Sequence, residues 1–213
     1  AGPGGLTAAL RLAQRGYQVT VFEKLPIPGG MMAVGIPEYR LPTDQLMAEV
    51  AHIERAGVEL RYNQALGRDF TLDELFAREG CHAVVLAIGA HRSRKLGVPG
   101  EEQAGVLPGT DFLRAVGLVN RGGGAGYTLP DMQGKRVAVV GGGNVALDAA
   151  RTAWRLGAQE VHVIYRRTRA DMPAYAEEVA AADQEGIQFH YLVNPVAIVG
   201  DGQVTGVVLQ RQR

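Results

Sequence analysis

Arg136-Val137-Ala138-Val139-Val140-Gly141-Gly142-Gly143-Asn144-Val145-Ala146 is the stretch that decides the fold. Its apolar start predicts a buried strand, its glycines a tight turn, and the residues from Val145 to Leu156 a helix. In such a turn the first glycine bends the chain, the second brings backbone N–H groups close to a pyrophosphate, and a small third residue lets helix pack on strand. We therefore expect a dinucleotide to be bound by Gly141, Gly143, Asn144, Val145 and Ala146.

A related pattern opens the chain. Gly2 and Gly5 of Ala1-Gly2-Pro3-Gly4-Gly5 occupy the second and third glycine positions, and a helix is expected to follow up to Arg15. The strand and the first glycine of the full motif do not precede it. Tyr17–Phe22 then predicts a strand that ends at Glu23, where a carboxylate can accept hydrogen bonds from ribose hydroxyls. The residues expected to bind this second dinucleotide are Ala1, Gly2, Pro3, Gly4, Gly5 and Glu23.

The two units differ at the end of their second strand. The matching stretch of the later unit is Val163-Ile164-Tyr165-Arg166-Arg167, which has two arginines and no acid. Guanidinium groups pair with a 2′-phosphate, which a carboxylate would repel. We therefore predict FAD at the first turn and NADPH at the second. The alternative is that Arg166 and Arg167 form a solvated basic loop.

The composition excludes several other classes of protein. The 22 basic and 22 acidic residues cancel, so there is no charge excess to attract nucleic acid or an anionic membrane surface. The one cysteine, Cys81, cannot form a dithiol pair or hold an iron–sulfur cluster. No apolar stretch reaches membrane-spanning length, so a cytoplasmic protein is expected. Glycine is abundant, at 29 of 213 residues, and clustered.

Strands that alternate with helices predict an α/β fold with two Rossmann-type nucleotide-binding units, each built on a parallel sheet. Further strands are expected at 58–62, 83–88 and 187–192, and a surface loop at the glycine run 122–126. The expected domains are an FAD-binding domain (1–98), a linker with a connecting helix (99–134) and an NADPH-binding domain (135–213). The fold is expected to be truncated at both ends, as part of a longer protein.

Several strings resemble the small chain of glutamate synthase, a flavoprotein module also found in dihydropyrimidine dehydrogenase and bifurcating NADPH–ferredoxin oxidoreductases. They are Pro28-Gly29-Gly30-Met31, Gly35-Ile36-Pro37-Glu38-Tyr39-Arg40-Leu41-Pro42, Gly141–Asp148, and Tyr165–Arg169 with Met172-Pro173-Ala174. The resemblance runs almost end to end, and the Gly35–Pro42 string is its most specific part.

The resemblance implies further site residues. FAD would also be contacted by Lys24, Gly30, Met31, Arg40, Leu66, Ala87 and Gly89. Ile88 stands where the family usually has threonine, which removes a hydroxyl. No catalytic side chain and no metal ligand is expected, because flavin and nicotinamide bring their own reactive chemistry.

The implied activity is hydride transfer from NADPH to FAD, followed by electron transfer to iron–sulfur clusters of a partner domain or larger subunit. Within this class the final acceptor stays open: glutamate synthase, ferredoxin or pyrimidine chemistry are alternatives. The competing hypothesis is a non-catalytic nucleotide-binding assembly subunit.

Overall fold

The computed structural model describes residues 1–123 and 126–212, so the predicted surface loop at 122–126 falls partly outside the described residues. The chain divides into two compact units. Unit 1 comprises Ala1–His91 and Arg114–Leu129, and unit 2 comprises Arg92–Leu113 and Pro130–Arg213. The division falls inside helix α5 (Gly109–Asn120). The domain bounds expected from the sequence stay a prediction.

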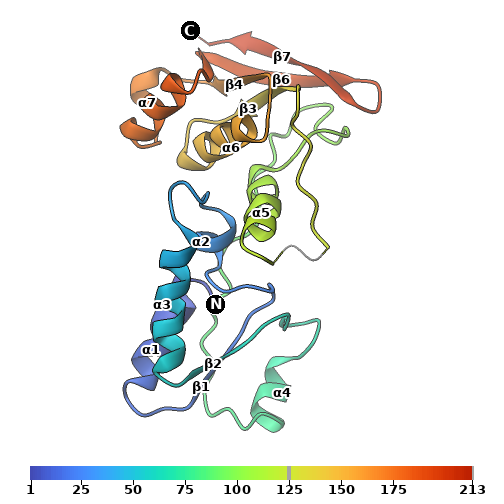
Figure 1. Ribbon diagram of the computed structural model, residues 1–213. Coiled ribbons are helices and arrows are strands. Elements are labelled where there is room, and N and C mark those ends of the chain that lie inside the picture. The colour runs from blue at the N-terminus through green and yellow to red at the C-terminus, as the bar shows by residue number, and fades with distance from the viewer. Residues whose placement is uncertain (124–125, 213) are drawn as a thin grey trace. The chain divides into compact units, whose positions relative to one another are not determined.

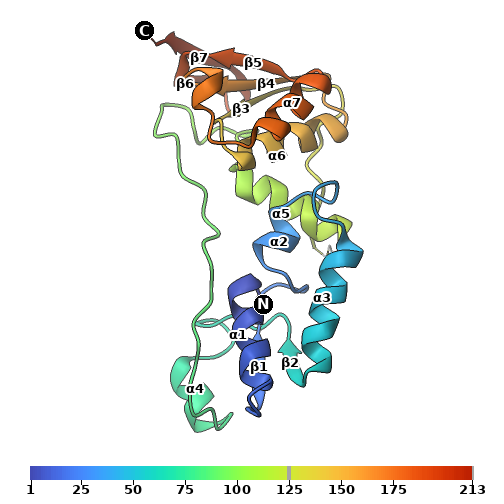
Figure 2. The same cartoon turned by 90° about the vertical axis from the view of Figure 1, so that its left-hand side faces the viewer.

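Unit 1 is built on two parallel strands, β1 (Val19–Phe22) and β2 (Val58–Arg61), which pair from Val19↔Val58 to Phe22↔Arg61. Figures 1 and 2 show α1 and α3 beside these strands. The helices of this unit are α1 (Pro3–Ala13), α2 (Met31–Val34), α3 (Thr43–Arg55) and α4 (Leu72–Ala77), joined by the C-terminal half of α5.

Apolar side chains at helical spacing explain how α1 and α3 attach to the sheet. One cluster joins the inner faces of the two helices to β2 through Leu6, Ala9, Val50, Ile53 and Val58. A second cluster joins α2, α3 and α5 through Leu25, Ile27, Ala33, Val34, Leu46 and Leu118. Burial of such side chains stabilises a fold by about 1.5–3 kcal/mol each.

Two helices of unit 1 begin in different ways. A capping box starts α4, since the Thr71 hydroxyl accepts from the Glu74 N–H and the Glu74 carboxylate accepts from the Thr71 N–H. At α3 the N-cap residue is Pro42, and Thr43 is the first helical residue. The Thr43 side chain donates to the Glu38 carboxylate.

The strand expected at 83–88 is wrong. These residues have no regular secondary structure, and Val85, Leu86 and Ile88 are 62%, 59% and 71% exposed. A strand needs a neighbour to pair with its backbone. Within the described part of the chain, residues 83–88 pair with no strand, so this apolar, β-branched stretch forms no ladder.

Unit 2 contains a three-stranded parallel sheet in the order β3-β4-β5 and an antiparallel hairpin, β6-β7. Figures 1 and 2 show α6 and α7 on one side of the sheet and the hairpin on the other. The strands are β3 (Arg136–Val140), β4 (Glu160–Tyr165), β5 (Gln188–Tyr191), β6 (Val193–Gly200) and β7 (Val204–Arg211). The helices are α6 (Asn144–Arg155), α7 (Ala176–Gln184) and the short 3₁₀ helix η1 (Arg169–Asp171).

Helix α6 is buried along most of its length, from Leu147 to Ala153. The polar member Arg151 is 8% exposed and its guanidinium pairs with Glu178 of α7 and, at 2.7 Å, with Glu185 just after α7. Arg155 reaches Glu185 at 2.9 Å. These ion pairs satisfy charges that would otherwise be costly to bury, and they join α6 to α7.

Among the residues that the structure describes, no helix is long and apolar enough to cross a bilayer. Within the same ranges, no three His, Cys, Asp or Glu side chains gather in a way that could hold a metal ion.

Candidate dinucleotide-binding sites

The glycine turn of unit 1 leads directly into helix α1, with Gly2 as an extended N-cap residue. No side chain caps this helix and no acid lies in its first turn. The loop at Gly29–Gly30 packs on the turn: the Gly29 N–H donates to the Ala1 carbonyl at 2.8 Å. A Cβ on Gly30, whose φ is +53°, would lie 2.7 Å from the Gly2 Cα. Gly2 and Gly30 are 28 residues apart in the sequence, and no sequence pattern predicted that they would be in contact.

Glu23 follows the last residue of β1 and lies beside the same turn. Its carboxylate is 7% exposed, accepts from the Leu25 N–H at 2.8 Å and contacts the nitrogen of Ala1. The Glu23 carbonyl also accepts from the Gln64 N–H at 2.9 Å. Lys24 follows on the exposed side. A buried carboxylate at this place has the geometry required to accept ribose hydroxyls near a pyrophosphate turn.

Ala87 reaches the turn although its segment is not a strand. A Cβ on Gly5 would lie 3.4 Å from the Ala87 Cβ, so the small residues allow the segment to approach α1. Gly89 has a φ of +67°, and a Cβ there would lie 3.4 Å from the His91 ring. Burial lowers the pKa of His91, and the charges of Lys24 and Arg114 lower it further. His91 lies in no sequence motif, so its place beside Gly89 was not predicted.

Three other predicted FAD residues lie further along the loops of unit 1. Met31 is the first residue of α2, directly after Gly30. Arg40 lies in a turn in which its N–H donates to the Pro37 carbonyl at 3.0 Å. Leu66 is 40% exposed and forms an isolated bridge with Phe70. Their contacts with a cofactor stay a prediction.

The glycine turn of unit 2 joins β3 to α6. The Gly141 N–H donates to the Ile164 carbonyl at 3.0 Å, and its φ of +132° suits glycine. A Cβ on Gly142 would lie 2.6 Å from the Tyr165 ring, and Gly143 is the N-cap residue of α6. Val145 is 49% exposed. Its neighbour Ala146 is partly buried, and a Cβ on Gly141 would lie 3.4 Å from the Ala146 Cβ.

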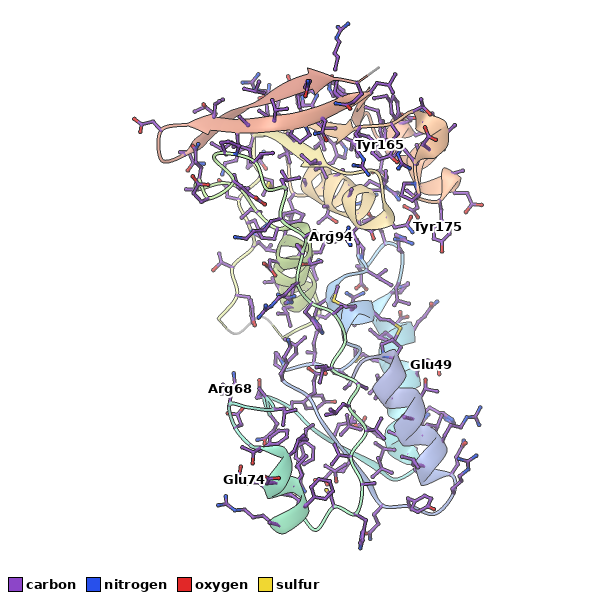
Figure 3. All side chains as sticks on the ribbon, turned by 180° about the vertical axis from the view of Figure 1, so that it is seen from behind. Glu49, Arg68, Glu74, Arg94, Tyr165 and Tyr175 are labelled. Atoms are coloured by element: carbon purple, nitrogen blue, oxygen red, sulfur yellow. The ribbon has the colours of Figure 1, made fainter. Side chains whose placement is uncertain are left out.

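The loop between β4 and α7 is fastened to this turn. Its ends are marked by Tyr165 and Tyr175 in Figure 3. The Asn144 side-chain oxygen accepts from the Tyr175 N–H at 3.0 Å, and the Ala174 N–H donates to the Gly142 carbonyl at 3.1 Å. The Tyr165 hydroxyl donates to the Asp171 carbonyl at 2.7 Å. The Asn144 side chain therefore holds a loop, a role that the sequence did not predict.

Arg166 and Arg167 begin the same loop and are exposed. Within the described residues, neither guanidinium makes a hydrogen bond or an ion pair, while Arg169 pairs with Asp183. The backbone beneath them is fixed, because the Arg167 carbonyl accepts from the Leu192 N–H at 3.1 Å. Thr168 and Asp171 cap η1, and hydrogen bonds from Thr168 lower the pKa of Asp171. Two cations thus stand on an ordered loop with their charges available to a ligand.

Helix termini in this chain follow a pattern that fits anionic ligands at the two turns. Helices α3, α4, α5 and α7 each have an acid in the first turn, which complements the partial positive charge of the N-terminus. Helices α1 and α6, which follow the glycine turns, have neither an acid nor a side-chain cap, and the same is true of the single-turn helix α2 after Gly30. The first N–H groups of α1 and α6 remain suited to phosphate oxygens.

Curated relatives match the whole chain. It is 50% identical over 216 residues to the NADP(+)-dependent formate dehydrogenase subunit beta of Moorella thermoacetica, covering 100% of this chain and 29% of that protein. It is 40% identical over 214 residues to a putative glutamate synthase [NADPH] small chain of Cereibacter sphaeroides, covering 100% of this chain and 51% of that protein. The chain thus spans about a third to a half of these relatives, and the resemblance to glutamate synthase small chains is confirmed.

Among solved structures, FprA of Mycobacterium tuberculosis in complex with NADPH matches with a TM-score of 0.76 at 22% identity, over 99% of this chain and 62% of that one. This match concerns the fold alone. Residues 1–213 match the family described as pyridine nucleotide-disulphide oxidoreductase. The chain therefore belongs to the pyridine nucleotide-disulphide oxidoreductase family, and the predicted α/β fold with two Rossmann-type units on parallel sheets is confirmed.

Proposed function

We propose that this chain carries the NADPH-oxidising, FAD-containing part of a larger electron-transfer enzyme. FAD would lie on the turn of unit 1 and NADPH on the turn of unit 2. When both are bound, the nicotinamide supplies a hydride and the flavin accepts it and can release single electrons. The observation that carries the proposal is the pair of glycine turns that lead into helices without a first-turn acid, α1 with the buried carboxylate of Glu23 beside its turn and α6 with two exposed arginines after the next strand.

The residues of the chain have binding and orienting roles in this proposal. In unit 1 the first N–H groups of α1 would hold the FAD pyrophosphate, and Glu23 would accept the adenosine ribose hydroxyls. In unit 2 the first N–H groups of α6 would hold the NADPH pyrophosphate, and Arg166 and Arg167 would pair with the 2′-phosphate. As in the sequence prediction, the proposal gives no side chain the role of an acid or base.

The partner is proposed from the relatives' names, which describe a subunit beta and a small chain. We propose that electrons leave toward iron–sulfur clusters in a partner domain or a larger catalytic subunit of a cytoplasmic complex. The formate dehydrogenase and glutamate synthase relatives point to different final substrates, and no residue described here selects between them.

Anaerobic reduction of the purified protein that contains this chain tests the proposal. The protein should be yellow, with the absorbance of an oxidised flavin near 450 nm. One equivalent of NADPH should bleach this band, and NADH at the same concentration should do so far more slowly. A colourless protein that still binds NADPH would contradict the proposal and support a non-catalytic assembly subunit. A yellow protein that neither nucleotide reduces would also contradict it.

A further inference from the structure

We propose that Arg121, directly after α5, is the positioning residue that fixes the segment after Gly30, which packs on the first glycine turn of the unit 1 site. This inference rests on the proposed FAD site at the first glycine turn. The segment expected to be a linker, 99–134, supplies this residue, so part of that segment would act in FAD binding.

The Arg121 guanidinium is buried in the α2 and α3 side of unit 1, with its side chain 1% exposed. Its donors go to backbone carbonyls rather than to a carboxylate. One NH₂ group donates to the Ala33 carbonyl and, at 3.2 Å, to the Ile36 carbonyl; the other donates to the Leu41 carbonyl at 2.7 Å. A single rigid fork therefore ties three points of the segment 33–41, which has only one helical turn of its own.

The surrounding residues fix the same segment against α5. Gly117 lies one turn before Arg121, and a Cβ there would be 2.8 Å from the Ala33 carbonyl oxygen. Leu118 is fully buried against Ala33 and Val34. The closest carboxylate, Glu38, is 3.6 Å from Arg121 and accepts from the Thr43 N–H at 2.8 Å. These contacts hold both ends of the segment.

The held segment begins at the glycine turn itself. Gly30 is packed on Gly2, α2 follows at Met31, and the three carbonyls bound by Arg121 come directly after. A dinucleotide whose pyrophosphate lies on Gly2–Gly5 would therefore lie beside this loop. Loss of the fork would release several backbone carbonyls without moving Glu23 or the turn, so it should alter how the flavin is held and leave unit 2 unchanged.

The test uses the complete flavoprotein with Arg121→Met, Arg121→Lys and, as a control, Arg15→Met at an exposed site after α1. We measure the Kd for FAD, the visible spectrum of the bound flavin and the Kd for NADPH. Arg121→Met should weaken FAD binding by about tenfold or more and shift the flavin absorbance, with NADPH affinity unchanged. Arg121→Lys should recover only part of the loss, because one ammonium cannot span three carbonyls. The control should match the wild type.

Wild-type FAD affinity and an unaltered flavin spectrum in Arg121→Met would overturn the inference, even if its melting temperature fell. Should Arg121→Met fail to fold, Gly117→Ala decides, since the added methyl group displaces the same Ala33 carbonyl; unchanged FAD affinity there would also overturn it. These failures differ from that of the proposed function. A colourless wild-type protein refutes the FAD site, whereas a yellow wild type with unaffected variants refutes only the role of Arg121.

Discussion

The two glycine turns share a backbone plan and differ in what surrounds it. The turn of unit 1 lies against other glycine-rich backbone, since Gly30 contacts Gly2, and its nearest ionised side chain is the buried Glu23. The turn of unit 2 lies against an aromatic ring, that of Tyr165, and the ionised side chains beyond it are exposed arginines. The N-terminus of α1 therefore lies near a buried acidic side chain, whereas that of α6 is followed by exposed basic side chains.

This difference suggests how one motif can be selective for either of two related dinucleotides. The N–H groups of α1 and α6 cannot distinguish one pyrophosphate from another, because both ligands present the same oxygens. Discrimination must come from the end of the next strand, where a carboxylate favours free ribose hydroxyls and guanidinium groups favour a phosphorylated one. The exposure of the two arginines also suits a substrate that must leave, whereas the enclosed carboxylate suits a retained cofactor.

The largest expected effect comes from adding one methyl group at each turn. Gly30→Ala places a Cβ 2.7 Å from the Gly2 Cα at a φ of +53°, so FAD affinity should fall by about 100-fold or more. Gly142→Ala places a Cβ 2.6 Å from the Tyr165 ring and should weaken NADPH binding to a similar extent. Titration of each variant with both nucleotides measures the two losses.

The control for these variants is Gly57→Ala, which has a φ of +94° and no atom within 4 Å of the added Cβ. It shares the positive φ of Gly30 and lacks the clash of either variant, so it should lower stability without changing either affinity. If Gly30→Ala and Gly142→Ala each weakened both ligands equally, the assignment of one ligand to each unit would be wrong.

Reversal of the two arginine charges should have the next largest effect. Arg166→Glu with Arg167→Glu removes two charge-assisted contacts and adds repulsion, so the Kd for NADPH should rise by about 100-fold. The Kd for NADH should change by less than about threefold, because NADH has no 2′-phosphate. Arg169→Gln is the matched control: its guanidinium is already paired with Asp183, so NADPH affinity should stay near that of the wild type. Equal losses for NADPH and NADH would contradict the 2′-phosphate assignment.

Sequence patterns predicted most of these elements because the patterns are local. The glycine turn at 141–143 and the helix after Ala1 need only neighbouring residues to form, and the strand at 136–140 has its partner, β4, in the same βαβ unit. The segment 83–88 has an equally apolar pattern and forms no strand, because a ladder depends on a partner elsewhere in the chain. The composition of residues 83–88 does not show whether another strand is available to pair with them.

Site residues show the same limit. Glu23 and the two arginines were predicted from their distance to a glycine turn; Glu23 follows β1 and the arginines follow β4, while their contacts with a cofactor stay a prediction. Arg121 was missed because its partners are carbonyls 80 to 88 residues away, which leave no mark in the sequence. Asn144 was predicted to bind a cofactor from its place in the glycine turn, and the contact of its side chain with the Tyr175 N–H, 31 residues away, left no mark in the sequence.

That contact provides a test of moderate expected size. Asn144→Ala removes the acceptor of the Tyr175 N–H and should lower the free energy of unfolding by about 1 kcal/mol. Asn144→Asp keeps an acceptor but adds a negative charge at the start of α6, so it should preserve stability and weaken NADPH binding by about tenfold. Denaturant unfolding and nucleotide titration measure the two effects. Equal NADPH affinity for the alanine and aspartate variants would show that no anion binds at this terminus.

The smallest expected effect concerns pH and again separates the units. Burial opposes the ionisation of Glu185, but hydrogen bonds from Arg155 and Arg151 outweigh it and lower its pKa from 4.5 to about 2. A carboxyl with a lowered folded-state pKa stabilises the fold above its unfolded pKa, and this contribution is lost as the pH falls through the folded pKa. Unit 2 should therefore lose stability between about pH 5 and pH 2, and Glu185→Gln should flatten this part of its profile. The Arg121 fork of unit 1 makes its hydrogen bonds to carbonyls, which do not titrate, and its ion pair with the half-exposed Glu38 is longer, at 3.6 Å, so amide exchange near Ala33 should show a weaker dependence over the same range. An equal acid response of the two regions, or one that survives in Glu185→Gln, would assign the sensitivity to other carboxylates.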